Sequence, residues 1–113
     1  MGLRGLVLAV TLVLSGPATA GQKVYEGEEA SALRCANMLA LTGVTLRNAE
    51  LMDDAEQEVL LGVTILILER HVSGTWAQKK AAMEQMRDRR SIEDTLADYQ
   101  RNAPLCLGRF PIN

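Results

Sequence analysis

Four stretches of the sequence repeat apolar residues at intervals of three or four, the spacing of one helix face. In the first stretch this spacing gives a single stripe, made of Ala32, Cys35, Ala36, Leu39, Gly43 and Leu46. Two early glutamates, Glu28 and Glu29, suit the positive end of a helix dipole. We predict a helix over residues 28–47, with Cys35 on its inward face.

The second stretch opens on a cap signal. Asp53 is followed three residues later by Glu56, an acidic version of the capping box. The run VLLGVTILIL, residues 59–68, is then apolar on every side, which is typical of a central helix. Its β-branched residues leave a buried strand as the alternative, but the cap signal and the polar lead-in AEQE favour a helix. We predict a helix over residues 54–72 and expect it to be the central one.

A third helix is predicted over residues 76–90. Thr75 offers an N-cap with Gln78 as its capping-box partner. Gly74, just before it, is a candidate C-terminal cap for the preceding helix. Trp76 shares a face with two methionines of this segment, and we expect it to close one end of the core.

The last helix is predicted over residues 92–103, where Ser91 with Asp94 supplies the start signal. Pro104 is expected to end or kink it, which leaves LCLGRFPIN as an irregular tail. The fold class that follows is all-α: one small bundle of about four short helices, antiparallel where the turns are tight.

The N-terminal 20 residues have the pattern of a secretory signal peptide. Arg4 forms a positive n-region, residues 6–14 form an apolar h-region, and the small residues ATA precede a cleavage site after Ala20. An uncleaved anchor is the alternative, but the apolar run is shorter than the ~20 residues that a membrane span requires. We expect residues 1–20 to be removed and residues 21–113 to form a single small helical domain in the periplasm or outside the cell, with no stable membrane span.

The two cysteines of the chain are expected to pair with each other. Cys35 lies too far downstream for lipid attachment, and there is no Cys-x-x-Cys motif for metal binding. Export removes both thiols from the reducing cytosol, and two cysteines allow only one intramolecular pairing. We predict a disulfide between Cys35 and Cys106, which closes a loop of about 70 residues and contributes about 4 kcal/mol.

Charge is distributed unevenly along the chain. Residues 21–69 contain three basic and nine acidic residues, net −6, whereas residues 70–113 contain eight basic and five acidic residues, net +3. We expect the two segments to pack with complementary faces. With removal of Arg4 the formal net charge changes from −2 to −3, which does not suggest nucleic acid as a partner.

The apolar run at residues 59–68 also suggests a contact surface. It must be covered on all sides, and the other predicted helices are short and partly charged. Any part left exposed would be an apolar patch of the kind that marks interaction sites. The candidate partner-contact residues are Leu61, Ile65, Leu68 and Trp76. The partner would be another protein or a second copy of the chain, and complete burial within a four-helix arrangement is the alternative.

Signatures of catalysis are missing from the sequence. There is no Gly-x-Ser-x-Gly, no His-Glu-x-x-His and no phosphate-cradling glycine loop, so we expect neither an enzyme nor a cofactor. His71 is expected to suit the negative end of a helix rather than to bind a metal. Met83 and Met86 could hold a soft metal such as Cu(I), but they are few, and methionine commonly fills gaps in a core.

Three functions remain compatible with these features. The first is a non-enzymatic binding protein, such as an accessory subunit, an inhibitor or an immunity-type factor of the bacterial periplasm. The second is a holdase-type acid-stress chaperone, because the layout of the chain is similar to that of small periplasmic proteins of Gram-negative bacteria that include such chaperones. This similarity covers layout and no motif, so it transfers no residue. The third is a copper carrier that uses His71 and the two methionines.

Overall fold

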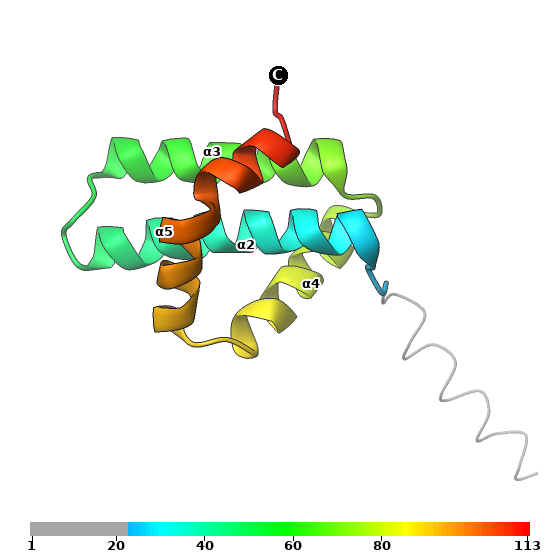
Figure 1. Ribbon diagram of the computed structural model, residues 1–113, viewed down its shortest axis with the longest axis horizontal. Coiled ribbons are helices and arrows are strands. Elements are labelled where there is room, and N and C mark those ends of the chain that lie inside the picture. The colour runs from blue at the N-terminus through cyan, green and yellow to red at the C-terminus, as the bar shows by residue number, and fades with distance from the viewer. Residues whose placement is uncertain (1–22) are drawn as a thin grey trace, which may run out of the picture.

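The computed structural model describes residues 23–113, which form four helices joined by short turns (Figure 1). The helices are α2 (Gly27–Asn48), α3 (Asp54–His71), α4 (Trp76–Asp88) and α5 (Ile92–Arg109). No strand occurs within residues 23–113, so the all-α prediction is confirmed and the strand alternative for the apolar run is wrong. The predicted signal peptide, residues 1–20, lies outside the described residues.

The central helix is α2, not the apolar α3 as predicted. It packs against each of the other three helices, while α3, α4 and α5 make few contacts among themselves (Figure 1). It buries nine residues: Ala32, Leu33, Cys35, Ala36, Asn37, Met38, Leu39, Thr42 and Gly43. Small side chains favour this position, because alanine and glycine let neighbouring helices approach closely. Gly43 faces the Leu60 side chain of α3, from which a Cβ atom at this position would lie 3.5 Å, an ordinary contact distance.

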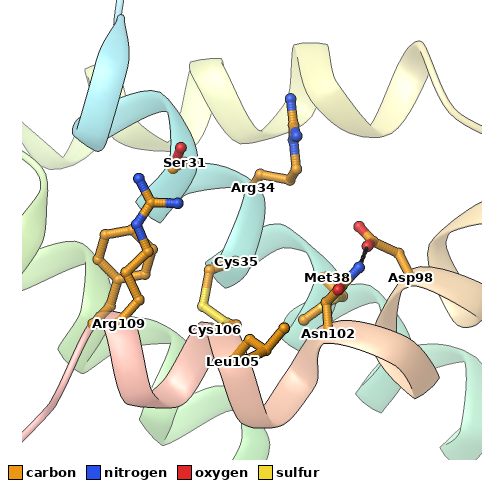
Figure 2. Close-up of a pocket in the computed structure, with 10 residues that line it drawn as sticks. Ser31, Arg34, Cys35, Met38, Asp98, Asn102, Leu105, Cys106 and Arg109 are labelled. Carbon is orange, nitrogen blue, oxygen red and sulfur yellow. Dashed lines mark hydrogen bonds between the residues drawn. A yellow bond between two sulfur atoms is a disulfide. The ribbon is translucent and has the colours of Figure 1, made fainter.

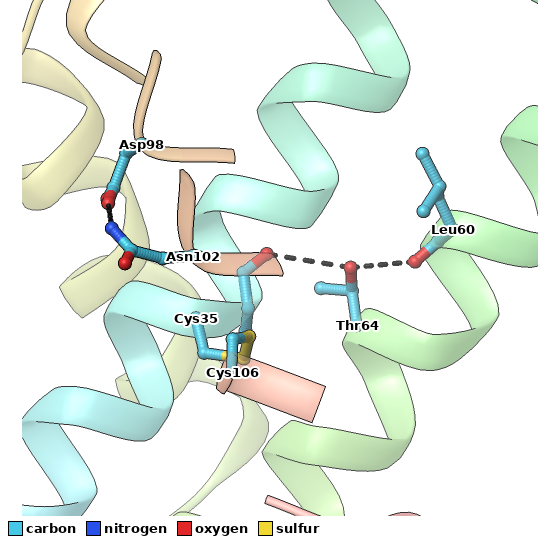
Figure 3. Close-up of a disulfide and its surroundings, with 7 residues drawn as sticks. Cys35, Leu60, Thr64, Asp98, Asn102 and Cys106 are labelled. Carbon is cyan, nitrogen blue, oxygen red and sulfur yellow. Dashed lines mark hydrogen bonds between the residues drawn. A yellow bond between two sulfur atoms is a disulfide. The ribbon is translucent and has the colours of Figure 1, made fainter. Parts of the chain in front are cut away.

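Helix α3 runs antiparallel to α2 and buries only part of its surface (Figure 1). Its buried residues are Thr64, Ile67 and Leu68. The Thr64 hydroxyl donates to the Leu60 carbonyl at 2.8 Å, so the polar group in the apolar run is satisfied within its own helix (Figure 3). Val59 remains 66% exposed. The described chain therefore does not enclose the apolar run.

The predicted cap signals are confirmed. Both members of the capping box form at Asp53 and Glu56, with the Glu56 amide donating to the Asp53 carboxylate at 2.8 Å. The Thr75–Gln78 box also forms in both directions. Each box satisfies backbone donors that have no partner inside the helix, and so determines where the helix begins.

Gly74 does not cap α3, contrary to the prediction. The C-cap is Val72, whose backbone is extended, and Gly74 lies two residues further on with φ 96°. This left-handed conformation favours glycine and allows the tight turn into α4. Lys79 satisfies the end of α3 instead: its ammonium donates to the Leu68 carbonyl at 2.8 Å, and the lysine is only 9% exposed.

The last helix continues through Pro104 to Arg109, so the prediction of an irregular tail is wrong. Figure 1 shows that α5 changes direction along its length. Proline removes one helical hydrogen bond and crowds the preceding turn. The helical segment beyond Pro104 is nevertheless held in place, because Cys106 is bonded to Cys35 of α2 and the Phe110 side chain is only 4% exposed.

The predicted disulfide between Cys35 and Cys106 is present and joins α2 to α5 (Figure 3). The two cysteines are 5% and 8% exposed. Close by, His71 Nε2 lies 2.7 Å from the Pro111 carbonyl oxygen, and its ring meets Phe110 edge to face. The disulfide and the histidine together attach the C-terminal end of the chain to α2 and α3.

The expected pairing of the acidic and basic segments is limited. Among the described residues, one ion pair joins the two segments, between Glu28 at the start of α2 and Arg109 at the end of α5. The other three ion pairs, such as the one between Arg47 and Asp54, each lie within one segment. Within residues 23–113, no single helix is both long enough and apolar enough to cross a membrane. Helices α3 and α4 meet these two criteria only when taken together, and the chain bends by 117° between them.

Candidate protein-binding groove

A groove of about 410 Å³ runs between α2, α3 and α4. Its lining is mainly apolar and includes Asn37, Ala40, Leu41, Val44, Leu61, Thr64, Ile65, Leu68, Trp76, Lys80, Met83, Glu84 and Arg87. All four residues that the sequence singled out for partner contact are in this set. The structure thus brings Leu61, Ile65, Leu68 and Trp76 to one site.

The four residues differ in how far they are exposed. Trp76 is 53% exposed and Ile65 is 43% exposed, while Leu61 is half-buried. Leu68 is only 1% exposed, so it belongs to the core beneath the groove and is not a surface contact as expected. The other three candidate side chains are accessible in the groove.

Trp76 does not close the core, contrary to the expectation. It is the first residue of α4, where the chain turns sharply away from α3. The inward positions of α4 are taken by Lys79 and by Ala82, Met83 and Met86, which pack against the core. The indole is therefore left at the edge of the groove, half in contact with solvent.

Asn37 is the residue that sequence analysis missed. It lies on α2, lines the groove and is 7% exposed, yet its amide makes no hydrogen bond to another described residue. The amide is open to the groove, because Thr42 Oγ1 is the one fully enclosed side-chain polar atom without a partner among the described residues. The signal in the sequence was a single asparagine in the otherwise apolar run CANMLAL. Its position outside the apolar stripe concealed it.

Charged side chains border the groove along α4. Lys80, Glu84 and Arg87 follow one another at the spacing of one helix face. Arg87 lies 3.6 Å from Asp88, whereas Lys80 and Glu84 make no ion pair with another described residue. The border of the groove therefore carries charges of both signs, and the Lys80 ammonium makes no ion pair within the described residues.

A second cavity, of about 240 Å³, lies beside the disulfide (Figure 2). Arg34 and Arg109 extend over it from α2 and α5, and Asp98 and Asn102 line its other end. Two of its polar groups bind each other, since Asp98 accepts from Asn102; Asp98 also accepts from Arg90, which lies outside the lining. Partial burial raises the pKa of Asp98, but these hydrogen bonds more than offset it and the pKa lies below its usual value.

No group of three or more His, Cys, Asp or Glu side chains within residues 23–113 is arranged to hold a metal. His71 faces the Pro111 carbonyl, and the predicted soft-metal pair, Met83 and Met86, packs against the core. The groove contains neither a histidine nor a cysteine. Its lining offers apolar contact and hydrogen bonding.

Comparison with known proteins finds no family model that matches the chain, and no curated protein or solved structure with significant similarity.

Proposed function

We propose that this protein is a small exported, non-enzymatic binding protein whose groove holds a segment of another protein. The role would be that of an accessory subunit, an inhibitor or an immunity-type factor of the bacterial periplasm. The observation that carries the proposal is the half-exposed pair Ile65 and Trp76, from two helices, over an apolar floor. Exposed aromatic and aliphatic side chains around a pocket are the usual anchors of protein recognition.

Export is supported by two independent features. The sequence begins with the pattern of a signal peptide, and the folded domain contains a disulfide, which persists in oxidising compartments.

The test is site-specific photo-crosslinking of the full chain in its native cell envelope. A photoreactive side chain at position 65 should capture one defined protein. The same group at Leu105, which is 70% exposed on α5 and outside the groove, is the matched control and should not capture it. Equal capture from both positions, or none from position 65, would contradict the proposal.

An acid-stress chaperone is the second candidate, and two carboxylates favour it. Hydrogen bonding to Arg109 holds the pKa of Glu28 below its usual value, and hydrogen bonding to Ser73 does the same for Glu29. These groups tie the start of α2 to α5 and to the turn before α4. Acid would protonate both and loosen these attachments. A domain that stays folded and binds no apolar dye down to about pH 2 would rule this candidate out.

A further inference from the structure

Helix α4 presents to the groove a stripe of side chains whose charges complement the same stripe turned end to end. We infer that a second copy of this chain covers the groove, with the two α4 helices packed antiparallel across a two-fold axis near residues 81 and 82. This inference goes beyond the proposed function, because it concerns the protein on its own and not its capture of a different protein.

Helix α4 is covered on one side only. Among the described helices it packs mainly on α2. Beside this packed side lies the stripe, which consists of Trp76, Lys80, Glu84 and Arg87. These residues are four, four and three positions apart, so they share a face about 80° wide. All four are exposed, so the stripe is open to a partner.

The spacing of the stripe fits an antiparallel copy of itself. Lys80 and Glu84 are centred on residue 82, while Trp76 and Arg87 are centred between residues 81 and 82. The two centres differ by half a residue, or about 0.75 Å along the helix axis. A single two-fold axis therefore sets Lys80 opposite Glu84 of the second copy and Trp76 opposite its Arg87.

Charge complementarity identifies the occupant as a second copy and fixes its direction. The four ion pairs of the described residues include neither Lys80 nor Glu84, so both charges are available. Antiparallel packing forms the Lys80–Glu84 contact twice, once in each direction, whereas parallel packing would set like charges against each other. The guanidinium of Arg87 is attracted to the face of an indole, and antiparallel helix dipoles place opposite partial charges side by side.

Apolar contact strengthens the same arrangement. Ile65 on α3 and Val44 on α2 line the groove and are 43% and 41% exposed, and Trp76 is 53% exposed. In a two-fold interface the same surface is buried on both copies, so each of these side chains loses solvent contact twice. Aromatic side chains near the centre of an interface commonly supply much of its binding energy. The charges then set the register, and the apolar side chains supply the attraction.

Sedimentation equilibrium of the mature protein tests the dimer. The wild type should show a reversible monomer–dimer equilibrium below millimolar concentration. Lys80→Glu and Glu84→Lys each turn both reciprocal contacts into repulsions, and each should weaken association at least tenfold. A tenfold change corresponds to about 1.4 kcal/mol, which the two symmetric contacts share. Arg101→Glu is the matched control, because Arg101 is exposed on α5 outside the groove, and this variant should dimerise as the wild type does.

An equal mixture of the two single variants is the sharper measurement. One variant is acidic at both positions and the other is basic at both, so every contact in a mixed dimer again joins opposite charges. The mixture should therefore dimerise about as strongly as the wild type, although neither variant does so alone. The doubly reversed variant, Lys80→Glu with Glu84→Lys, should also regain association, because the reversal preserves the complementary pattern.

Three results would overturn the inference. These are a wild-type protein that stays monomeric up to millimolar concentration, single reversals that leave association unchanged, and a mixture of the two variants that stays monomeric. If circular dichroism showed that Lys80→Glu does not fold, Glu84→Lys and the doubly reversed variant would decide the matter.

The proposed function fails or holds separately. A crosslink from position 65 to a second copy gives a product of twice the mass of the chain, whereas capture of a different protein gives another mass. A monomer that captures a different protein would refute the dimer and leave the proposed function intact. A dimer that captures only itself would do the reverse.

Discussion

The disulfide offers the sharpest quantitative test of the fold. We consider the double variant Cys35→Ala with Cys106→Ala, which removes the only covalent link between α2 and α5 described in the structure. Both residues are nearly buried, so alanine is preferred to serine because it adds no hydroxyl group to the core.

The size of the effect follows from the loop that the bond closes. The cysteines are 71 positions apart. Loop-closure entropy for that length is about 15 cal/mol/K, or about 4.4 kcal/mol at 25 °C. The 91 described residues are expected to have a free energy of unfolding of about 5–14 kcal/mol. Loss of the bond therefore removes a large part of the stability, and the melting temperature should fall by about 18–35 °C.

Urea unfolding measures this directly. The double variant should lose about 4 kcal/mol, and its m-value should rise because the denatured chain is no longer cross-linked. Wild-type protein in reductant is the control, since it opens the bond without removing the sulfur atoms. A loss below about 1 kcal/mol with an unchanged m-value would show that the bond does not act through the denatured state.

Three further predictions concern single positions. Thr42 is fully buried, and its hydroxyl has no hydrogen-bond partner among the described residues. Thr42→Val should therefore raise the free energy of unfolding, measured in urea, by about 1 kcal/mol. A loss of stability would mean that the hydroxyl is hydrogen-bonded in solution. Gly62→Ala should stabilise the protein by about 0.5–1 kcal/mol, because nothing lies within 4 Å of the new methyl group on α3. Gly74→Ala should destabilise it by more than about 1 kcal/mol, because φ is 96° and the methyl group would lie 2.7 Å from the Tyr25 hydroxyl. Equal melting temperatures of the two variants would contradict this contrast. The folded-state pKa of Glu28 is lowered, so its contribution to stability is present above the usual carboxyl pKa and is lost as pH falls through the lowered value. Glu28→Gln should therefore be less stable than wild type at pH 7 but equally stable near pH 2. A constant difference in stability across this pH range would contradict the ion pair.

The sequence predicted those parts of the fold that depend on local chemistry. The cap signals at Asp53 and Thr75 were recognisable because a capping box involves residues only three apart. The disulfide was recognisable because two cysteines allow one pairing. Three of the four candidate partner-contact residues are accessible and lie together. For Leu61 and Ile65 this was predictable, because α3 has more apolar side chains than the other helices can cover.

What the sequence did not reveal depends on contacts between distant segments. The central position of α2 results from its small side chains, which a hydrophobicity pattern counts as weakly apolar. The helix beyond Pro104 is held by the bond at Cys106 and the burial of Phe110, and these tertiary contacts outweigh the local effect of proline. The position of Asn37 in the groove depends on how α3 and α4 pack around α2.

The arrangement of three helices around α2 has a consequence for local unfolding. Helix α5 is covalently bound to α2, and α3 lies along it over most of its length, whereas α4 is held by a smaller contact and by Lys79. Amide hydrogens of α4 should therefore exchange with solvent at a lower free energy than those of α2, which are released only when the whole domain opens. Helix α4 also forms one wall of the groove, so the most easily detached helix sets the width of the binding site. A bulkier partner could be admitted by displacing this wall while the remaining three helices stay folded.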